Sequence, residues 1–202
     1  VLFRSEPDYA LFCEMGTGKS KILLDTIGLL FAEGDINAAI IVAPKGVYKN
    51  WQKMELPKHL PDDIIAKSDI ITWSANQSVT QKKMLEQGLR TDDRYKILII
   101  NVEAFSSERG SSYALKFATT HKCLMAVDES TTIKNRSAAR TKSIIKVGSY
   151  AKYRRIMTGS PVTKSPMDLF SQCSFLGSSL LGHSSFYTFQ NRYAKMIRSE
   201  ER

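Results

Sequence analysis

A glycine-rich segment near the amino end of the chain restricts its possible folds more than any other feature. It runs from Cys13 to Ser20 as CEMGTGKS, after a short apolar run and before a segment of helical period. Backbone N–H groups of such a loop can wrap phosphate groups, and Gly16 and Gly18 let the backbone approach them because neither carries a Cβ. The segment therefore predicts a strand, a phosphate-binding loop and a helix, in that order. The residues expected to contact a nucleotide are Glu14, Met15, Gly16, Thr17, Gly18, Lys19 and Ser20.

Short runs of β-branched and apolar residues alternate with segments of helical period along the chain. Strands are expected at 9–13, 38–43, 69–73, 96–101, 122–128 and 153–158. Helices are expected at 18–32, 47–56, 77–87, 112–119 and 138–149. Several strand runs are apolar at consecutive positions, as a strand covered on both faces requires. The pattern predicts an α/β fold in three layers, with a mostly parallel central sheet between two layers of helices.

Two adjacent acids, Asp128 and Glu129, close one of the expected strands. Parallel strands bring their carboxyl ends to one edge of the sheet, so we expect these acids beside the phosphate loop. There Lys19 would reach the β- and γ-phosphates, while Ser20 and, through water, Asp128 would hold Mg²⁺. Glu129 would orient and deprotonate the attacking water. The sequence thus predicts hydrolysis of ATP with Mg²⁺, with Lys19, Asp128 and Glu129 as catalytic residues.

A third segment, Thr158-Gly159-Ser160, begins at the last residue of the expected strand 153–158. It would deliver two hydroxyl groups to the same sheet edge, where they could sense whether the γ-phosphate is present. Taken alone, the sequence Gly-Ser-Pro is more typical of an ordinary turn.

Charge gives a first indication of a partner. The net charge of +9 favours binding to polyanions, and its dispersal along the chain indicates a folded groove instead of a basic arm. Three cysteines and three histidines are scattered without the spacing of a metal site. The cysteines are therefore expected to be reduced thiols in or near the core. The longest apolar run, 38–43, is too short for a membrane span.

Four segments in order resemble the motifs of a known protein group. EMGTGKS, IIVAPKGVYKNW, VDESTTIKN and MTGSPV are similar to motifs I, Ia, II and III of superfamily 2 helicases. More narrowly, they resemble Swi/Snf-type translocases of double-stranded DNA, including phage and bacterial members, over roughly residues 9–193. The resemblance implies a RecA-like P-loop NTPase lobe that works with DNA and with a second RecA-like lobe of the same polypeptide.

The resemblance also implies roles for further residues. Thr158, Gly159 and Ser160 match the motif that couples the nucleotide site to the nucleic acid. The positions that match nucleic-acid contacts or the extension of motif II are Pro44, Lys45, Asn101, Lys134 and Asn135. Thr131 stands where many relatives carry His or Gln, so the connection between motifs II and III is expected to differ here.

The chain begins at Val1 and stops within a charged stretch, 191–202, so we expect a fragment. Residues 1–202 would form one ATP-binding domain, with a helical tail from about 166 directed toward a missing second lobe. The adenine-reading segment and the arginine finger of the family have no counterpart, so slow hydrolysis and a monomeric state are expected for the fragment. We expect a bacterial or phage-infected cytoplasm, or a nucleus if the source is eukaryotic.

Other interpretations remain at this point. A P-loop kinase or GTPase would need a guanine-reading motif or an arginine-rich lid, and neither is evident. The motor lobe of a restriction-type translocase, and a nucleotide-gated clamp that does not translocate, both fit the motifs. Among single residues, Trp51 and Trp73 are expected in the core, Met54 and Met125 as core gap fillers, and Arg154–Arg155 as solvated charge.

Overall fold

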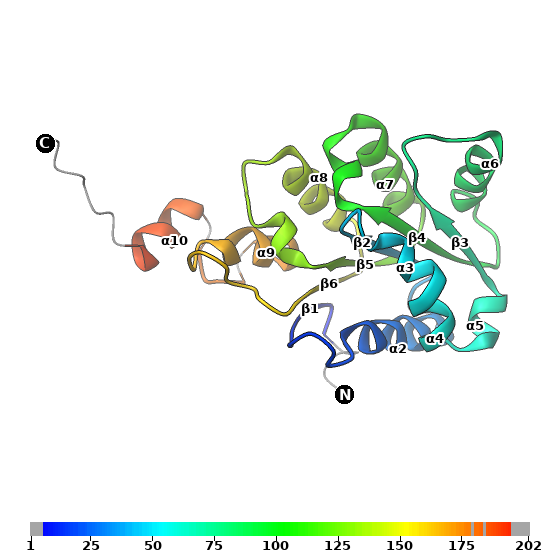
Figure 1. The fold of residues 1–202 in the computed structure, drawn as a ribbon, viewed down its shortest axis with the longest axis horizontal. Helices are drawn as coiled ribbons and strands as arrows, with labels where there is room; N and C mark the ends of the chain where they lie inside the picture. The colour runs from blue at the N-terminus through cyan, green and yellow to red at the C-terminus, as the bar shows by residue number, and fades with distance from the viewer. Residues whose placement is uncertain (1–5, 179, 184, 195–202) are drawn as a thin grey trace, which may run out of the picture.

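Six strands form one sheet in the computed structural model, which describes residues 6–178, 180–183 and 185–194 (Figure 1). The strand order is β1-β6-β5-β2-β4-β3, and every neighbouring pair is parallel. The strands are β1 (Asp8–Phe12), β2 (Ala38–Ala43), β3 (Ser68–Thr72), β4 (Tyr95–Asn101), β5 (Cys123–Asp128) and β6 (Tyr153–Thr158). All six agree with the strands expected from the sequence to within one residue at each end.

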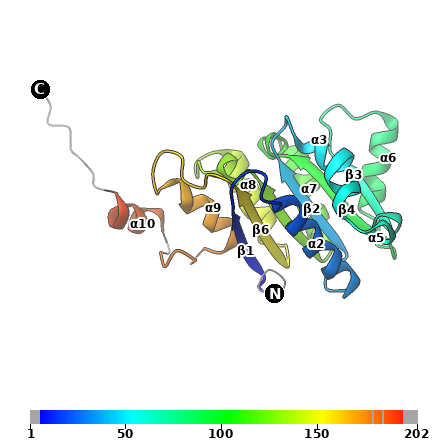
Figure 2. The same ribbon diagram turned by 60° about the horizontal axis from the view of Figure 1, so that its bottom comes forward.

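Helices cover both faces of the sheet (Figures 1 and 2). One face carries α2 (Lys19–Ala32), α3 (Tyr48–Asn50), a π-helix (Trp51–Glu55), α4 (Leu56–His59) and α5 (Asp62–Ala66). The other face carries α6 (Val79–Gly88), a 3-10 helix (Val102–Ser106), α7 (Glu108–Thr120), α8 (Ala139–Gly148) and α9 (Asp168–Leu176). A second 3-10 helix (Ser130–Ile133) follows β5, and α10 (Phe186–Tyr193) lies beyond α9 at one end of the molecule. The three-layer α/β fold is confirmed.

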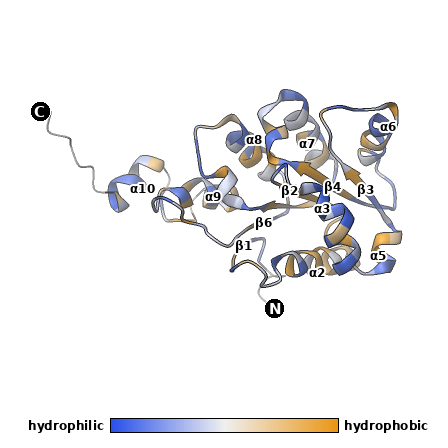
Figure 3. Ribbon diagram, in the orientation of Figure 1, coloured by the Kyte–Doolittle hydropathy of each residue, from blue (hydrophilic) through white to orange (hydrophobic). Residues whose placement is uncertain are grey.

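The strands are apolar at consecutive positions because both of their faces are buried. Side chains alternate between the two faces of a strand, so Leu98 and Ile100 of β4 enter one core while Ile97 and Ile99 enter the other. Figure 3 shows apolar strands in the middle and polar residues on the outer sides of the helices. Both faces are therefore closed to solvent, and the polar groups that can act on ligands gather at the ends of the strands.

Two expected helices differ from the structure. The segment expected as one helix at 47–56 is divided into α3, a π-helix and α4, and α5 was not expected. α4 ends before Pro61, whose preceding residue Leu60 is extended, as proline requires. α7 begins four residues before the expected 112 because the Ser107 hydroxyl caps it by accepting from the Gly110 N–H.

Single-residue expectations had mixed outcomes. Trp51 and Trp73 are buried, as expected. The expectation that Arg155 is a solvated charge is wrong, because Arg155 is only 2% exposed. Its guanidinium donates to the carbonyl oxygens of Glu6 and Pro7, which immediately precede β1. Arg154 forms an ion pair with Asp8 at 2.6 Å. Among the methionines, Met125 is buried, as expected, whereas the expectation for Met54 is wrong, because this residue of the π-helix is 63% exposed.

The carboxyl-terminal part of the chain packs through aromatic side chains. Phe170 of α9 contacts the rings of Phe186 and Phe189 of α10, and Arg136 lies 4.2 Å from the ring centroid of Phe186. Residues 195–202, which belong to the expected helical tail, lie outside the described residues. None of the helices in the described ranges combines the length and the apolarity that a membrane span needs.

Candidate functional site

The carboxyl edge of the sheet brings the three predicted motifs together. β6 lies between β1 and β5, with Phe12 opposite Thr158 and Met157 opposite Asp128. The phosphate loop leaves β1, the acids end β5, and the Thr158 segment ends β6. The three neighbouring strands therefore deliver Lys19, Asp128 and Thr158 to one region, as their expected positions on a parallel sheet require.

The phosphate loop has the backbone conformation that its glycines permit. Gly16 and Gly18 have φ angles of 79° and 86°, in the left-handed region, and Gly18 caps the amino end of α2. The first turn of α2 contains no acidic residue, so its positive end is available to an anion. The Lys19 ammonium donates to the carbonyl oxygens of Cys13 at 2.7 Å and Glu14 at 2.8 Å. Lys19 would have to exchange these contacts for phosphate oxygens.

Asp128 is held by two donors. The Trp51 indole Nε1–H donates to Asp128 Oδ2 at 3.1 Å, and the Glu129 backbone N–H donates to Asp128 Oδ1 at 3.0 Å. Burial raises the pKa of Asp128, while the hydrogen bond from Trp51 and the charge of Lys19 act in the opposite direction. The carboxylate is therefore kept in one orientation at the end of β5.

Glu129 connects the end of β5 to the end of β6. It is the one non-glycine residue with positive φ among the described residues, at 47°, which is a strained conformation for a side chain of this kind. Its Oε2 accepts from the Thr158 hydroxyl at 3.0 Å, and that hydroxyl accepts from the Ser160 N–H at 3.2 Å. Thr158 is 1% exposed, whereas Ser160 is exposed and reaches Thr158 through its backbone. The two segments are thus physically connected, although through one side-chain hydroxyl instead of two.

Gly159 lies against the phosphate loop. A Cβ placed on Gly159 would be 3.5 Å from the Met15 backbone nitrogen and 3.6 Å from the Cys13 carbonyl oxygen. The end of β6 therefore bonds to Glu129, and the segment after β6 lies close enough to the loop after β1 that a side chain at position 159 would contact it.

Gln172 of α9 is a buried polar residue that the sequence reasoning missed. The Ser130 hydroxyl donates to Gln172 Oε1 at 2.6 Å, and Gln172 Nε2 donates at 2.7 Å to the carbonyl oxygens of Pro161 and Asp168. Gln172 is 0% exposed. A glutamine inside the apolar helical run FSQCSFL was the available signal, because a buried amide requires partners. It connects the residue after Glu129 to the loop after β6.

The five residues predicted to face nucleic acid fall into two groups. Pro44 and Lys45 follow β2 and Asn101 ends β4, so these three lie at the other half of the carboxyl edge. Lys45 is exposed, and Asn101 Oδ1 accepts from the Ala104 N–H, which caps the following 3-10 helix. The other group, Lys134 and Asn135, follows the 3-10 helix after β5.

Local partners already engage the second group. Lys134 donates to the Thr163 hydroxyl and lies 4.0 Å from the Asp168 carboxylate. Asn135 Oδ1 accepts from the backbone and the hydroxyl of Ser137. The Thr163 hydroxyl, with backbone N–H groups, lowers the pKa of Asp168 to about 2. Lys134 therefore fastens the loop after β6 to the segment after β5.

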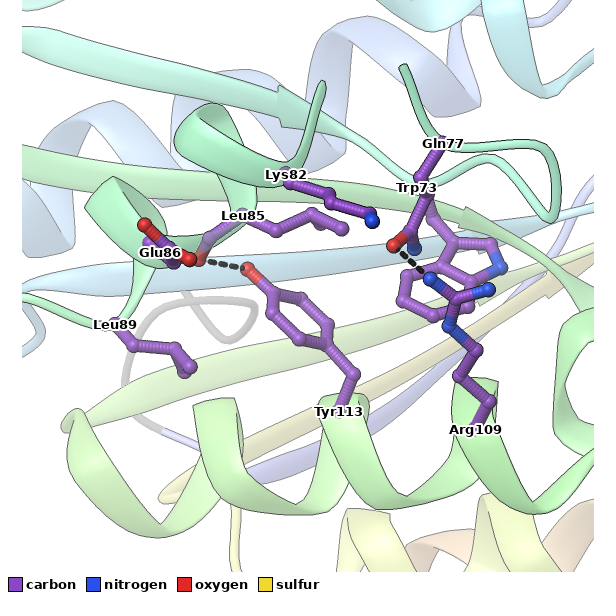
Figure 4. Close-up of a pocket in the computed structure, with 8 residues that line it drawn as sticks. All are labelled: Trp73, Gln77, Lys82, Leu85, Glu86, Leu89, Arg109 and Tyr113. Carbon is purple, nitrogen blue, oxygen red and sulfur yellow. Dashed lines mark hydrogen bonds between the residues drawn. The ribbon is translucent and has the colours of Figure 1, made fainter. Parts of the chain in front are cut away.

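A hollow of about 340 Å³ lies away from these residues, between α6 and α7 (Figure 4). Trp73, Leu85 and Tyr113 form its apolar part, and Tyr113 donates to the Leu85 carbonyl oxygen at 2.8 Å. Arg109 donates to Gln77 at its polar end. None of the residues predicted for the nucleotide site lines it.

The residues at the ends of β1, β5 and β6 fit a nucleoside triphosphate with Mg²⁺. The ammonium of Lys19, the N–H groups of the loop and the positive end of α2 suit phosphate oxygens. The hydroxyl of Ser20 and the carboxylate of Asp128 are the oxygen ligands that Mg²⁺ prefers. Glu129 completes the set with a second carboxylate at the same edge.

Known proteins resemble this chain along nearly its whole length. A family model described as SNF2-related domain matches residues 7–202. The chain is 27% identical over 164 residues to helicase SWR1 of Cryptococcus neoformans and 26% identical over 176 residues to the probable ATP-dependent DNA helicase CHR12 of Arabidopsis thaliana. It is 25% identical over 195 residues to the DNA repair and recombination protein RAD54B of Gallus gallus.

These alignments cover 81%, 87% and 93% of this chain but 12%, 15% and 19% of the three proteins. The chain therefore spans less than a fifth of the length of these curated relatives. All three come from eukaryotes, so they do not support the expected phage or bacterial type.

A solved structure has the same fold. The SWI2/SNF2 ATPase core of Sulfolobus solfataricus, determined in complex with double-stranded DNA, matches with a TM-score of 0.72 at 21% identity. The match covers 96% of this chain and 36% of that one. It confirms the RecA-like arrangement that the motifs implied.

Proposed function

The chain belongs to the SNF2-related domain family, and on that premise we propose that it is the ATP-binding lobe of a motor that moves along double-stranded DNA. The observation that carries the proposal is the convergence of the phosphate loop, the acid pair and Thr158 at the ends of three adjacent strands. A nucleotide-storage site would not require a second carboxylate bonded to a neighbouring strand. Hydrolysis does, because the attacking water must be oriented.

Each residue of the nucleotide site has a proposed role that follows from its position. Lys19 and the N–H groups after Cys13 bind the phosphates, and Ser20 with Asp128 holds Mg²⁺. Mg²⁺, when bound, neutralises charge on the phosphate oxygens. Glu129 accepts the proton of the attacking water, and Thr158 holds Glu129 in place through the 3.0 Å hydrogen bond.

The other half of the carboxyl edge is the proposed DNA track. Lys45 is exposed beside Pro44, Asn101 ends the neighbouring strand, and the net charge of the chain is +9. Exposed lysine gains affinity for a phosphate backbone by releasing counterions, without reading sequence. The relatives are named as a helicase, a probable ATP-dependent DNA helicase and a DNA repair and recombination protein, which supports DNA as the nucleic acid and favours a nuclear location.

A second RecA-like lobe of the same polypeptide would complete the site. Family resemblance predicts that this lobe supplies an arginine to the transferred phosphoryl group, a contribution of about 10³ to 10⁵ in rate. The chain by itself would therefore hydrolyse ATP slowly. In the intact protein, closure of both lobes on ATP would move them along the duplex.

Displacement of a third strand tests translocation directly. The full-length protein is added to a duplex that carries a triplex-forming strand at one end, with ATP or with a non-hydrolysable analogue. A translocase releases the third strand only with ATP. Retention of the strand under both conditions would indicate the alternative, a nucleotide-gated clamp, while the motor of a restriction system would release the strand and differ in its flanking domains.

A further inference from the structure

Trp51 connects the two halves of the carboxyl edge. It is the first residue of the π-helix that follows α3, and its side chain is 2% exposed. The segment that carries it leaves β2, whereas its indole N–H reaches Asp128 at the end of β5, 77 positions later in the chain. β2 and β5 are neighbours in the sheet, so the bond crosses from the proposed DNA track to the proposed Mg²⁺ site.

The hydrogen bond restricts Asp128 in a way that packing alone would not. An indole N–H is a donor only, and it points at Oδ2 while the Glu129 N–H occupies Oδ1. Rotation of the carboxylate would break one or both bonds in a partly buried position. Trp51 thereby helps to fix the orientation of the Asp128 carboxylate at the end of β5.

The backbone around Trp51 supports a specialised role. A π-helix is rare, and such turns occur frequently at functional sites. This one spans Trp51–Glu55 between two α-helical turns, and the Leu56 N–H donates to the Trp51 carbonyl oxygen. Six positions before Trp51 lies Lys45, exposed and placed on the proposed DNA track. One short segment therefore carries both a DNA-facing residue and the donor to Asp128.

We propose that Trp51 is a positioning residue that holds Asp128 for Mg²⁺ binding and transmits the state of the DNA track to it. This inference rests on the proposed function and adds the route by which DNA regulates the same site. A shift of the segment from Lys45 to Trp51 on DNA binding changes the direction of the indole N–H. The orientation of Asp128, and with it the binding of Mg²⁺, follows that shift.

The second tryptophan provides a matched control. Trp73 is buried to a similar degree, at 3% exposed, but it lies in the core on the opposite face of the sheet and packs against Tyr113. Trp51→Phe and Trp73→Phe remove the same atoms from two buried sites. Only the first removes a donor to Asp128.

The experiment uses the full-length protein and measures nucleotide binding as a function of Mg²⁺ concentration by calorimetry. Trp51→Phe should raise the Mg²⁺ concentration for half-maximal binding roughly tenfold, as expected for a lost bond to a charged group, and should reduce DNA stimulation of the ATPase. Trp73→Phe should leave both unchanged. Wild-type Mg²⁺ dependence and wild-type stimulation in Trp51→Phe overturn the inference.

Fluorine NMR spectroscopy gives a second measurement, which does not require the Trp51→Phe variant to fold. 5-Fluorotryptophan is incorporated at position 51 alone in one sample and at position 73 alone in a second sample, by suppression of an amber codon, so that each signal is assigned before any ligand is added. Addition of Mg²⁺ to the complex with a non-hydrolysable ATP analogue should move the Trp51 signal and not that of Trp73. A Trp51 signal that stays in place while calorimetry shows Mg²⁺-nucleotide binding refutes the inference alone. If the wild type binds no Mg²⁺-nucleotide, the proposed function fails, and the inference fails with it.

Discussion

The strands β1, β6 and β5 end in a different way from β2 and β4, although all of them reach the same edge of one sheet. In the first group, side chains from distant parts of the chain bond to one another, as Glu129 does to Thr158 and Ser130 to Gln172. In the second group, Asn101 bonds to its own loop and Lys45 is exposed to solvent. We refer to these regions by their proposed roles, as the catalytic half and the track half.

The difference corresponds to what each half would have to do. Hydrolysis depends on groups held within a fraction of an ångström of their working positions, and long-range bonds fix such positions. Binding to a phosphate backbone depends on accessible charge and tolerates flexible side chains. Trp51, on the segment that follows β2 in the track half, donates a hydrogen bond to Asp128 in the catalytic half and so connects the two.

The largest expected effect lies in the catalytic half. Glu129→Gln should lower the ATP hydrolysis rate of the full-length protein about 10²- to 10⁴-fold, because the amide cannot accept the proton of the attacking water. ATP binding should persist, since the phosphate loop is unchanged. Rates are measured by phosphate release and binding by calorimetry. Glu86→Gln on α6 makes the same change outside the site and should have wild-type rates; equal activity of both variants would remove Glu129 from its proposed role.

The bonds of Gln172 test whether the catalytic half depends on long-range contacts. Gln172→Leu leaves the Ser130 hydroxyl and the Pro161 carbonyl without their partner, so it should lower the free energy of unfolding by about 1–3 kcal/mol. Urea unfolding measures the change. Ser130 and Gln172 are joined by one hydrogen bond. Ser130→Ala should therefore lower the free energy of unfolding by less in the Gln172→Leu background than in the wild type. Additive effects of the two substitutions would contradict the coupling.

The track half should show a different kind of response. Lys45→Ala should weaken DNA binding roughly three- to tenfold and reduce the slope of log affinity against log salt by about 1. Hydrolysis without DNA should be unchanged. Lys122→Ala is the matched control, because Lys122 is exposed at the amino edge of the sheet, before β5. A loss of basal hydrolysis in Lys45→Ala would show that the two halves are not distinct.

The smallest effect concerns Asp168, whose carboxylate accepts from Thr163 and lies near Lys134. Its pKa is about 2 in the folded chain, below the ordinary 3.8, so the ionised form stabilises the fold. That stabilisation is complete above about pH 4 and is lost as the pH falls toward 2. Asp168→Asn should therefore lower the free energy of unfolding by about 1 kcal/mol at pH 6, allowing for solvent screening, and the difference from wild type should shrink below pH 4. A difference independent of pH would contradict the assigned cause.

The sequence predicted which side chains gather at the carboxyl edge of the sheet, but it did not indicate the residues that support them. Lys19, Asp128 and Thr158 follow from strand ends, because a parallel sheet brings such ends to one edge whatever the strand order. Trp51 and Gln172 act across 77 and 42 positions of sequence, so their partners depend on which strands and helices are neighbours. No local pattern records that order.

Two charged residues show the same limit. Lys134 is predicted to face nucleic acid, and its ammonium group also donates to Thr163 and lies near Asp168, two partners that the sequence did not indicate. Arg155 was expected in solvent, but its guanidinium donates hydrogen bonds to backbone carbonyl oxygens just before β1. A cation in a sequence shows that a charge is present, whereas its partner is determined by the tertiary structure.

The proposed function makes the chain the ATP-binding lobe of a motor driven on double-stranded DNA. The most direct test is the steady-state ATPase rate of the full-length protein with saturating ATP and Mg²⁺, measured without nucleic acid and with increasing concentrations of linear duplex DNA. A DNA-driven motor should show a rate that rises with DNA and saturates, whereas Glu129→Gln should stay far below the wild-type basal rate with and without DNA. A wild-type rate that is the same with and without DNA would contradict the proposed function.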